Sequence, residues 1–240
     1  MSYPDYLRDG LVWLNDPLNW TNSGGILDRL GEHLFISACA VLLGCVIGLP
    51  LGLVLGHLGR GGAVVVAANL TRAIPTLALL TILPLTPLGF GKLPVIIALA
   101  VFAVPPLLAN AYTGVREIDR EMIESARGMG LSGGQILRRV ELPLAVPYLA
   151  AGLRSAGVQV VATAALAAFV NGGGLGQIIA AGFGIGIDNG GAGQIVAGGL
   201  VVAVLALAVE GLLAVLQRLV TPRALRRERR RRDAVAVPGA

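Results

Sequence analysis

Residues 34–56 read LFISACAVLLGCVIGLPLGLVLG, a run of 23 residues that contains no Asp, Glu, Lys or Arg. An α-helix rises about 1.5 Å per residue, so about 20 apolar residues cross the hydrocarbon core of a bilayer. This run therefore predicts a membrane-spanning helix, and it places the chain among the all-α membrane proteins.

Further apolar stretches lie on the C-terminal side of this run. Hydrophobic residues make up 55% of the 240 residues and charged residues only 14%, against about 25% charged residues in a typical soluble domain. We predict about five spans, which form a bundle at about residues 33–58, 63–88, 93–115, 144–170 and 192–217. Residues 172–186 are too rich in glycine and too short to cross, and we expect a re-entrant or surface helix there.

The chain divides into three parts around these spans. Residues 1–32 form a short extracytoplasmic segment, in which Trp13 and Trp20 suit a helix lying in the membrane interface. A flexible tail is the alternative for this segment. Residues 33–218 form the transmembrane domain, and residues 219–240 form a basic tail that we expect to be cytoplasmic and disordered.

The placement of basic residues predicts the orientation in the membrane. In a five-span arrangement Arg8, Arg29 and Lys92 fall on one side. Fourteen of the nineteen Lys and Arg fall on the other side, in three groups: Arg60; Arg116, Arg120, Arg127, Arg138 and Arg139; and Arg218, Arg223, Arg226, Arg227, Arg229, Arg230, Arg231 and Arg232. Because cytoplasmic loops are enriched in Lys and Arg, we expect the N-terminus outside and the C-terminus in the cytoplasm. The basic tail then faces membrane lipid, and we expect no nucleic-acid partner.

Glycine and proline spacing predicts how the spans pack. Four glycines recur every four residues on the first span and form a small-residue ridge that lets another helix approach closely: Gly44, Gly48, Gly52 and Gly56. Four prolines fall in the second and third spans, which we expect them to interrupt: Pro75, Pro84, Pro105 and Pro106.

Residues 116–143 form the one long polar segment, a loop between the third and fourth spans on the cytoplasmic side. Asp119 can cap a helix that ends at Gly128 and Gly130. Ser132 can cap a second helix, which we expect Pro143 to close before the fourth span.

The sequence of this loop resembles that of a known family of transporters. Its spacing matches Glu-Ala-Ala, three residues, Gly, nine residues, Ile, one residue and Leu-Pro, the pattern of the permeases of binding-protein-dependent (type I) ABC importers. The match is carried by Glu124, Ser125, Ala126, Gly130, Val140, Leu142 and Pro143, with Ser125 in place of Ala and Val140 in place of Ile.

The resemblance implies a role for the loop and a set of partners. In that family the first helix of the loop is a coupling helix that docks in a groove on the ATPase, which implies a coupling helix at about Arg120 to Met129 with Glu124 as a polar contact. The implied partners are a dimer of ABC ATPase subunits, which binds ATP and Mg, a second permease subunit of the same or a homologous chain, and an extracytoplasmic substrate-binding protein. No cofactor is implied for this chain, which would lie in the cytoplasmic membrane of a prokaryote. The plain alternative is an amphipathic loop helix on the membrane surface.

A second pattern in the loop is typical of a different class of protein. Leu131-Ser-Gly-Gly-Gln135 reads like the signature of the ABC ATPases themselves. The chain has no Gly-x-x-x-x-Gly-Lys-Ser/Thr phosphate loop, because Gly91-Lys92 is preceded by Thr86 where the first Gly belongs. We therefore interpret the pattern as a coincidence and predict that the chain is not an enzyme.

The wider chain resembles the osmoprotectant branch of these permeases, the importers of glycine betaine, carnitine and choline. The resemblance is carried by residues 72–80 (RAIPTLALL), 110–114 (NAYTG), 123–130 (IESARGMG) and 172–176 (GGGLG). Methionine-type permeases share part of these patterns and are the alternative. Candidate pathway-lining residues are Thr71, Thr76, Tyr112 and Thr163, although a packing role, with the hydroxyl bonded to its own helix, is the alternative for each.

Two charged residues fall at membrane depth in neighbouring spans. Arg154 on the fourth span and Glu210 on the fifth lie at similar distances from the cytoplasmic side, and we predict that they form a buried ion pair. Separate snorkelling to the cytoplasmic water is the alternative. An ion-coupled carrier would bury more acids and show repeated halves, and a passive channel would not need the loop at 116–143, so both classes fit less well.

Overall fold

The computed structural model describes residues 3–221, and every regular element within that range is a helix. In chain order the α-helices are α1 (Tyr3–Asn15), α2 (Leu18–Thr21), α3 (Ile26–His57), α4 (Gly62–Leu70), α5 (Thr76–Ile82), α6 (Lys92–Arg116), α7 (Arg120–Gly128), α8 (Gly133–Ile136), α9 (Leu142–Ala164), α10 (Gly176–Ile185) and α11 (Gly191–Val220). Shorter helical segments are Thr71–Ala73, Leu83–Leu85, Leu137–Glu141, Ala165–Val170 and Ile187–Asn189. Most of the predicted basic tail, residues 222–240, lies outside the described residues.

Four helical runs are long and apolar enough to cross a membrane, and a bent pair makes up to five. The four are Leu18–His57, Lys92–Arg116, Gly133–Val170 and Gly191–Val220. The pair is α4 with α5, bent by 82° where the single second span was expected. The break lies at Pro75, because a proline has no N–H to donate and pushes the residue before it, Ile74 (ψ 126°), into an extended conformation.

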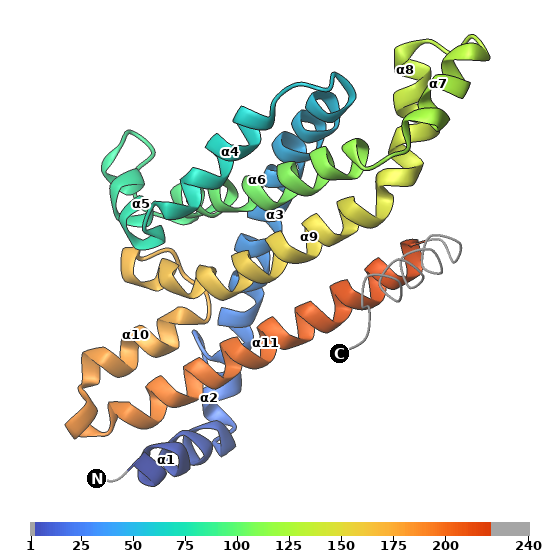
Figure 1. Ribbon diagram of the computed structural model, residues 1–240. Coiled ribbons are helices and arrows are strands. Elements are labelled where there is room, and N and C mark those ends of the chain that lie inside the picture. The colour runs from blue at the N-terminus through green and yellow to red at the C-terminus, as the bar shows by residue number, and fades with distance from the viewer. Residues whose placement is uncertain (1–2, 222–240) are drawn as a thin grey trace, which may run out of the picture.

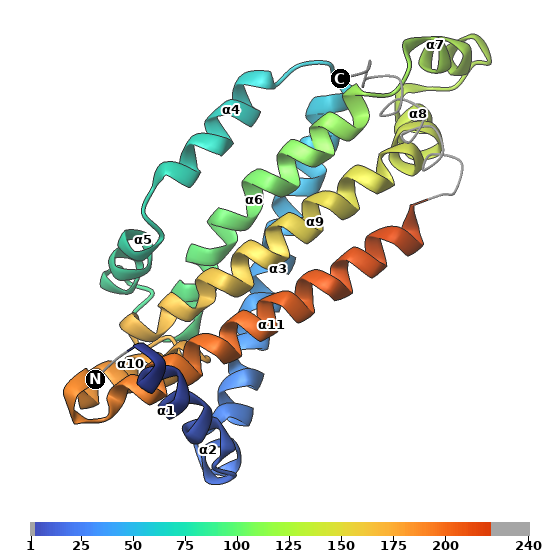
Figure 2. The same ribbon diagram turned by 60° about the horizontal axis from the view of Figure 1, so that its bottom comes forward.

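The glycine ridge of the first span packs against α6, as Figure 1 and Figure 2 show for the two helices. A Cβ added to Gly44 would lie 2.7 Å from Ala103 Cβ, and one added to Gly52 would lie 2.5 Å from the carbonyl oxygen of Leu108. The two backbones therefore approach too closely for any side chain, and the predicted small-residue ridge is confirmed.

Pro105 and Pro106 do not interrupt the third span, so that expectation is wrong. Helix α6 runs without a break through both, and both are buried. Membrane helices tolerate proline where neighbouring groups satisfy the freed backbone. The missing amides leave the carbonyl oxygens of Val101 and Phe102, four residues earlier, outside the usual helical hydrogen-bond pattern, and the helix continues past them.

The N-terminal segment is helical and packs against the end of the bundle. Figure 2 shows α1, α2 and α10 at one end, and α7 and α8 at the other. Helix α1 lies against α11, and Trp13 packs on a small core of Ile26, Leu175 and Ile178. The expected boundary at residue 32 falls inside α3, which begins at Ile26, because the helix continues past the apolar run through Asp28 and Glu32.

Candidate functional site

Helix α7 is closed at both ends by local hydrogen bonds. At its start the Glu121 amide donates to Asp119 Oδ1 at 3.0 Å. At its end the Leu131 amide donates to the Ala126 carbonyl and the Gly130 amide to the Arg127 carbonyl, the paired bonds of a Schellman motif. The helix therefore needs no contact with the membrane domain to end where it does.

Gly130 is required for its backbone conformation and not for its size. Its φ is +83°, a left-handed value that residues with a side chain rarely adopt, and a Cβ added there would meet nothing within 4 Å. The left-handed backbone conformation, and not a lack of space, therefore requires glycine at this position.

The face of α7 that points away from the bundle is uncovered in this chain. Glu124 and Ser125 are exposed, whereas Ala126 is 2% exposed. Met122 and Met129 expose 47% and 75% of their surface. A short helix that presents a carboxylate beside flexible apolar side chains can dock in a groove on another protein.

The sequence Leu131–Gln135, which reads like an ATPase signature, has a local structural role. Gln135 Oε1 accepts a 2.8 Å hydrogen bond from the Ser132 amide, and the two residues form a capping box at the start of α8. Gln135 therefore closes a helix terminus.

Pro143 does not close the second helix of the loop, so that expectation is also wrong. Helix α8 continues through a π-helical turn, Leu137–Glu141, directly into α9. In this turn the Leu142 amide donates to the Leu137 carbonyl, which lets the chain reach Pro143 without a break although Pro143 has no amide to donate. Within the motif Val140 is half-buried and Leu142 and Pro143 are exposed.

A polar contact that the sequence analysis missed joins the loop to the first span. His57 Nδ1, at the end of α3, and Glu141 Oε2, in the π turn, share a hydrogen bond of 2.7 Å. The Glu141 side chain is only 6% exposed. Glu141 occupies the motif position between Val140 and Leu142, which the family pattern leaves open, so only its charge beside a span could have drawn attention to it.

The structure brings Arg154 and Glu210 together across α9 and α11. Arg154 Nε donates to Glu210 Oε1 at 2.8 Å, and Nη2 donates to the same oxygen. The side chains are 39% and 34% exposed, so the pair lies at a cavity wall. We expected a buried pair, and this part of the prediction is wrong. Arg154 Nη1 also donates to Gln217 Oε1 at 3.2 Å.

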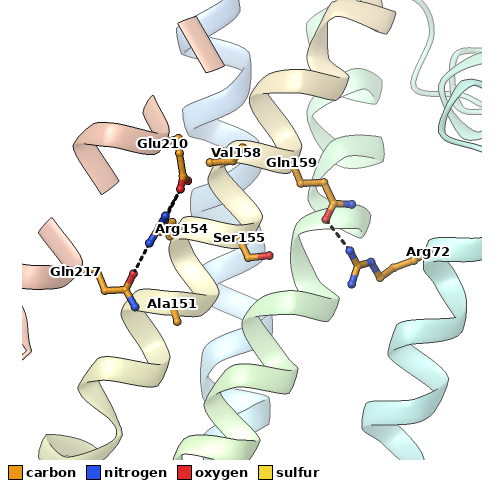
Figure 3. A pocket seen from close by; sticks show the side chains of 8 residues that line it. All are labelled: Arg72, Ala151, Arg154, Ser155, Val158, Gln159, Glu210 and Gln217. Atoms are coloured by element: carbon orange, nitrogen blue, oxygen red, sulfur yellow. Dashed lines mark hydrogen bonds and ion pairs between the residues drawn. The ribbon is translucent and has the colours of Figure 1, made fainter. Parts of the chain in front are cut away.

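This cavity has a volume of about 670 Å³, and six of its eight lining residues are polar or charged. Helices α9 and α11 supply most of its wall, and Arg72 reaches in from the break between α4 and α5 (Figure 3). Its lining residues are Arg72, Ala151, Arg154, Ser155, Val158, Gln159, Glu210 and Gln217. None of the four predicted pathway residues belongs to this set.

Two of those four residues bond to their own helix. Thr71 Oγ1 donates to the Ala68 carbonyl at 2.7 Å, and Thr163 Oγ1 donates to the Gln159 carbonyl at 2.7 Å. Thr76 and Tyr112 are half-buried. The structure therefore favours the packing role for Thr71 and Thr163.

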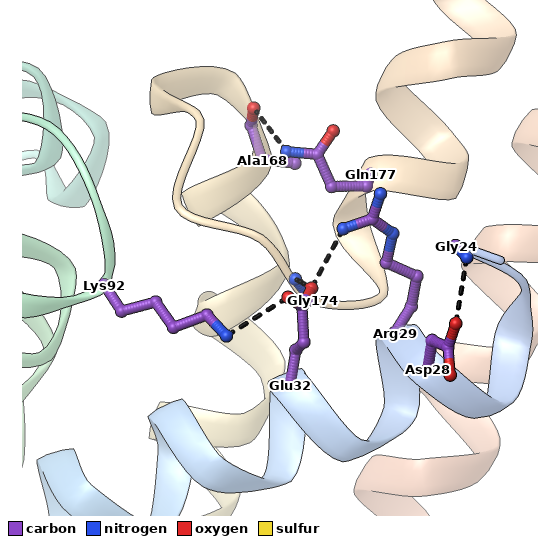
Figure 4. A network of polar contacts seen from close by, with 8 residues as sticks. All are labelled: Gly24, Asp28, Arg29, Glu32, Lys92, Ala168, Gly174 and Gln177. Carbon is purple, nitrogen blue, oxygen red and sulfur yellow. Dashed lines mark hydrogen bonds and ion pairs between the residues drawn. The ribbon is translucent and has the colours of Figure 1, made fainter.

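At the opposite end Glu32 joins three elements, as Figure 4 shows. Its Oε2 accepts from Arg29 Nη1 at 2.9 Å and from the Gly174 amide at 3.1 Å, and its Oε1 lies 3.1 Å from Lys92 Nζ. The carboxylate thereby ties α3 to α6 and to the glycine loop before α10. This contact also escaped the sequence analysis.

Comparisons with a family of sequences, with individual proteins and with solved structures all give matches. The sequence pattern of the family described as "binding-protein-dependent transport system inner membrane component" matches residues 40–222. The glycine betaine/carnitine/choline transport system permease protein OpuCB of Bacillus subtilis (strain 168) is 41% identical over 148 residues, 61% of this chain and 67% of that protein. The choline transport system permease protein OpuBB of the same organism is 40% identical over 148 residues, with the same two shares. An inward-facing structure of the MetNI methionine ABC transporter superposes with a TM-score of 0.71 at 26% identity, covering 92% of this chain and all of that one.

Proposed function

The chain belongs to the family of binding-protein-dependent transport system inner membrane components, and from that premise we propose that it forms the membrane pathway of an importer for quaternary amines such as glycine betaine, carnitine or choline. It is a multi-pass permease subunit of the cell membrane, and ATP hydrolysis resides in a separate subunit. The observation that carries the proposal is the family match over residues 40–222, which includes the exposed helix α7.

Helix α7 is the proposed docking element for the ATPase. It stands at the end of the bundle, and Glu124 is free to meet a donor on a partner. The Schellman motif and the Asp119 cap hold the helix as one rigid unit, so a push on its exposed face moves the whole helix. Glu124, Ser125 and Ala126 form the proposed contact region.

The continuous run Gly133–Val170 is the proposed lever from the ATPase to the pathway. The helix begins in the cytoplasmic loop and passes through the π turn without a break. Further along the same helix Arg154 and Gln159 face the cavity. A movement of the loop therefore displaces the cavity wall, and the His57 to Glu141 hydrogen bond couples that movement to α3.

The proposed topology has the N-terminus outside and the C-terminus in the cytoplasm. Five crossings, with α4 and α5 as one bent span, put Arg60, the basic residues of the 116–143 loop and Arg218 on the same side. The positive-inside rule makes that side cytoplasmic. A cysteine at Asp16 should then react with an impermeant reagent from outside and one at Ser132 should not; the opposite pattern would overturn this topology.

The proposed assembly has two permease subunits, two ATPase subunits and an extracytoplasmic substrate-binding protein. Helix α11 supports a lipid or subunit contact, because it exposes large side chains at Val204, Leu207, Leu212 and Leu219. In the proposed division residues 1–32 meet the outside, 33–218 form the transmembrane domain and 219–240 form a cytoplasmic tail.

The names of the relatives support the substrate class. One relative is named for glycine betaine, carnitine and choline, and the other for choline alone. The methionine transporter superposes well but is less similar in sequence, at 26% identity, so methionine remains the alternative substrate.

Uptake by a reconstituted transporter tests this proposal. The permease would be placed in liposomes with its ATPase and binding protein, and ATP-dependent uptake of glycine betaine, carnitine, choline and methionine would be compared. We expect uptake of at least one quaternary amine and none of methionine. Uptake of methionine alone would refute the substrate class, and Glu124→Lys should abolish uptake while membrane insertion stays normal.

A further inference from the structure

The cavity between α4–α5, α9 and α11 carries an unbalanced positive charge. Of its eight lining residues two are arginines and one is an acid. Glu210 is already paired with Arg154, which also donates a hydrogen bond to the Gln217 side chain. Arg72 is thus left as a cation without a carboxylate partner among the described residues.

Arg72 has most of its hydrogen-bonding capacity unused. A guanidinium has five N–H donors. Among the residues described, the one hydrogen bond of this side chain runs from Nη2 to Gln159 Oε1, and at 3.4 Å it is long. Figure 3 shows the Arg72 side chain directed toward α9 and Gln159.

The position of Arg72 fits a substrate site. It lies in the short 3₁₀ segment Thr71–Ala73, at the break that bends the α4–α5 pair by 82°. Discontinuous helices line the substrate sites of many transporters, and a charge at membrane depth is kept where it serves a ligand or an ion. The cavity volume of about 670 Å³ falls within the range of about 300–1,000 Å³ for small-molecule pockets.

The chemistry of the lining residues determines which end of a quaternary amine the cavity can bind. An aromatic cage holds a trimethylammonium group by cation–π contacts, but none of the eight lining residues is Phe, Tyr or Trp. A carboxylate, in contrast, fits the planar fork of a guanidinium and can accept two hydrogen bonds from it. On the other wall every hydrogen bond to Glu210 ends on Oε1, so among described contacts Oε2 remains available to the ammonium end.

We propose that this cavity is a substrate site in the membrane and that Arg72 binds the carboxylate of zwitterionic substrates, so that the permease itself favours betaines and carnitine over choline, which has no carboxylate. This inference rests on the proposed function. It places part of the substrate selection in this chain, in addition to whatever the binding protein selects.

The test compares two substrates in the same variant. The complete transporter would be reconstituted with Arg72→Gln, with Arg72→Lys and with the control Arg60→Gln, which removes a guanidinium from the exposed loop between α3 and α4. Uptake of glycine betaine and of choline would be measured with the same binding protein throughout. We expect Arg72→Gln to lower the ratio of betaine to choline uptake at least tenfold, and Arg60→Gln to leave it unchanged. Arg72→Lys keeps the positive charge but loses the planar fork, so it should lower the ratio less than Arg72→Gln does.

Each other outcome is decisive. An equal loss of both substrates in Arg72→Gln, as expected if Arg72 only supports the fold or binds a lipid phosphate, would overturn the inference. If the wild type imports betaine but not choline, Arg72→Lys must retain part of the betaine uptake that Arg72→Gln loses, and equal loss in both variants overturns the inference. A wild type that imports choline alone also overturns it but leaves the proposed function intact, whereas a wild type that imports neither these compounds nor carnitine overturns the proposed function itself.

Discussion

Gly52 in α3 offers the sharpest test of how the bundle is held together. In Gly52→Ala the new Cβ would lie 2.5 Å from the Leu108 carbonyl oxygen and 2.7 Å from Ala111 Cβ. Carbon atoms in contact sit about 3.5–4.0 Å apart, so α6 must move away by about 1 Å. Because the obstructing atoms include the backbone of α6, no side-chain rotation can relieve the contact.

The expected magnitude follows from two opposing effects. Overpacking a well-packed helix contact costs about 1–3 kcal/mol. Replacing glycine by alanine inside a helix gains about 0.5–1 kcal/mol. The matched control is Gly31→Ala in the same helix, where an added Cβ meets nothing within 4 Å, so only the gain remains.

The assay is the free energy of unfolding in mixed detergent micelles titrated with a denaturing detergent. We expect Gly52→Ala to be less stable than Gly31→Ala by about 1–3 kcal/mol, because the propensity term cancels between them. A difference below about 0.5 kcal/mol, the usual scatter of surface substitutions, would refute the close approach of α3 and α6.

Three further predictions concern the site. Reversing the charge of Arg154 or of Glu210 alone should lower the yield of assembled transporter severalfold, and reversing both charges should partly restore the yield. A lower yield from the double reversal than from either single one would contradict the ion pair. His57→Gln should leave ATP hydrolysis while reducing uptake, since it weakens the link from the loop to α3, and hydrolysis and uptake that stay in the wild-type proportion would exclude a coupling role. Gly130→Ala should weaken ATPase binding about tenfold, because an alanine in the left-handed conformation costs about 1–2 kcal/mol. The control Gly134→Ala, whose added Cβ meets nothing within 4 Å, should bind normally. Equal affinities of the two variants would contradict the requirement for a left-handed backbone at Gly130.

The spans and the glycine ridge could be predicted because they depend on local periodicity. The run from Leu34 to Gly56 is long enough to cross a bilayer, and glycines at every fourth position lie on one helical face. The partner of that ridge, α6, could not be predicted in the same way. Periodicity tells which face is small, but not which helix packs against it.

The prolines show where local rules fail. Pro75 breaks its span, Pro105 leaves α6 intact, and Pro143 lies just after a π turn in a continuous helix. The residue type is the same, but the outcome depends on whether neighbouring groups and local winding accommodate the missing amide. Those neighbours are set by the tertiary structure.

The site was partly predictable for a similar reason. Arg154 and Glu210 could be matched because depth along two neighbouring spans can be counted from the sequence. His57 and Glu141 are 84 residues apart and lie at helix ends, and Glu32 and the Gly174 amide are 142 residues apart. Single polar contacts of this kind follow no period, so only the folded chain reveals them.

Site-specific crosslinking tests the central claim that α7 couples this permease to a separate ATPase. A photoreactive residue at Ser125, exposed on α7, would be compared with one at Ser23, exposed at the opposite end of the bundle, in the assembled transporter. We predict an adduct with the ATPase subunit from Ser125 and none from Ser23. No ATPase adduct from Ser125, or equal adducts from both positions, would contradict it.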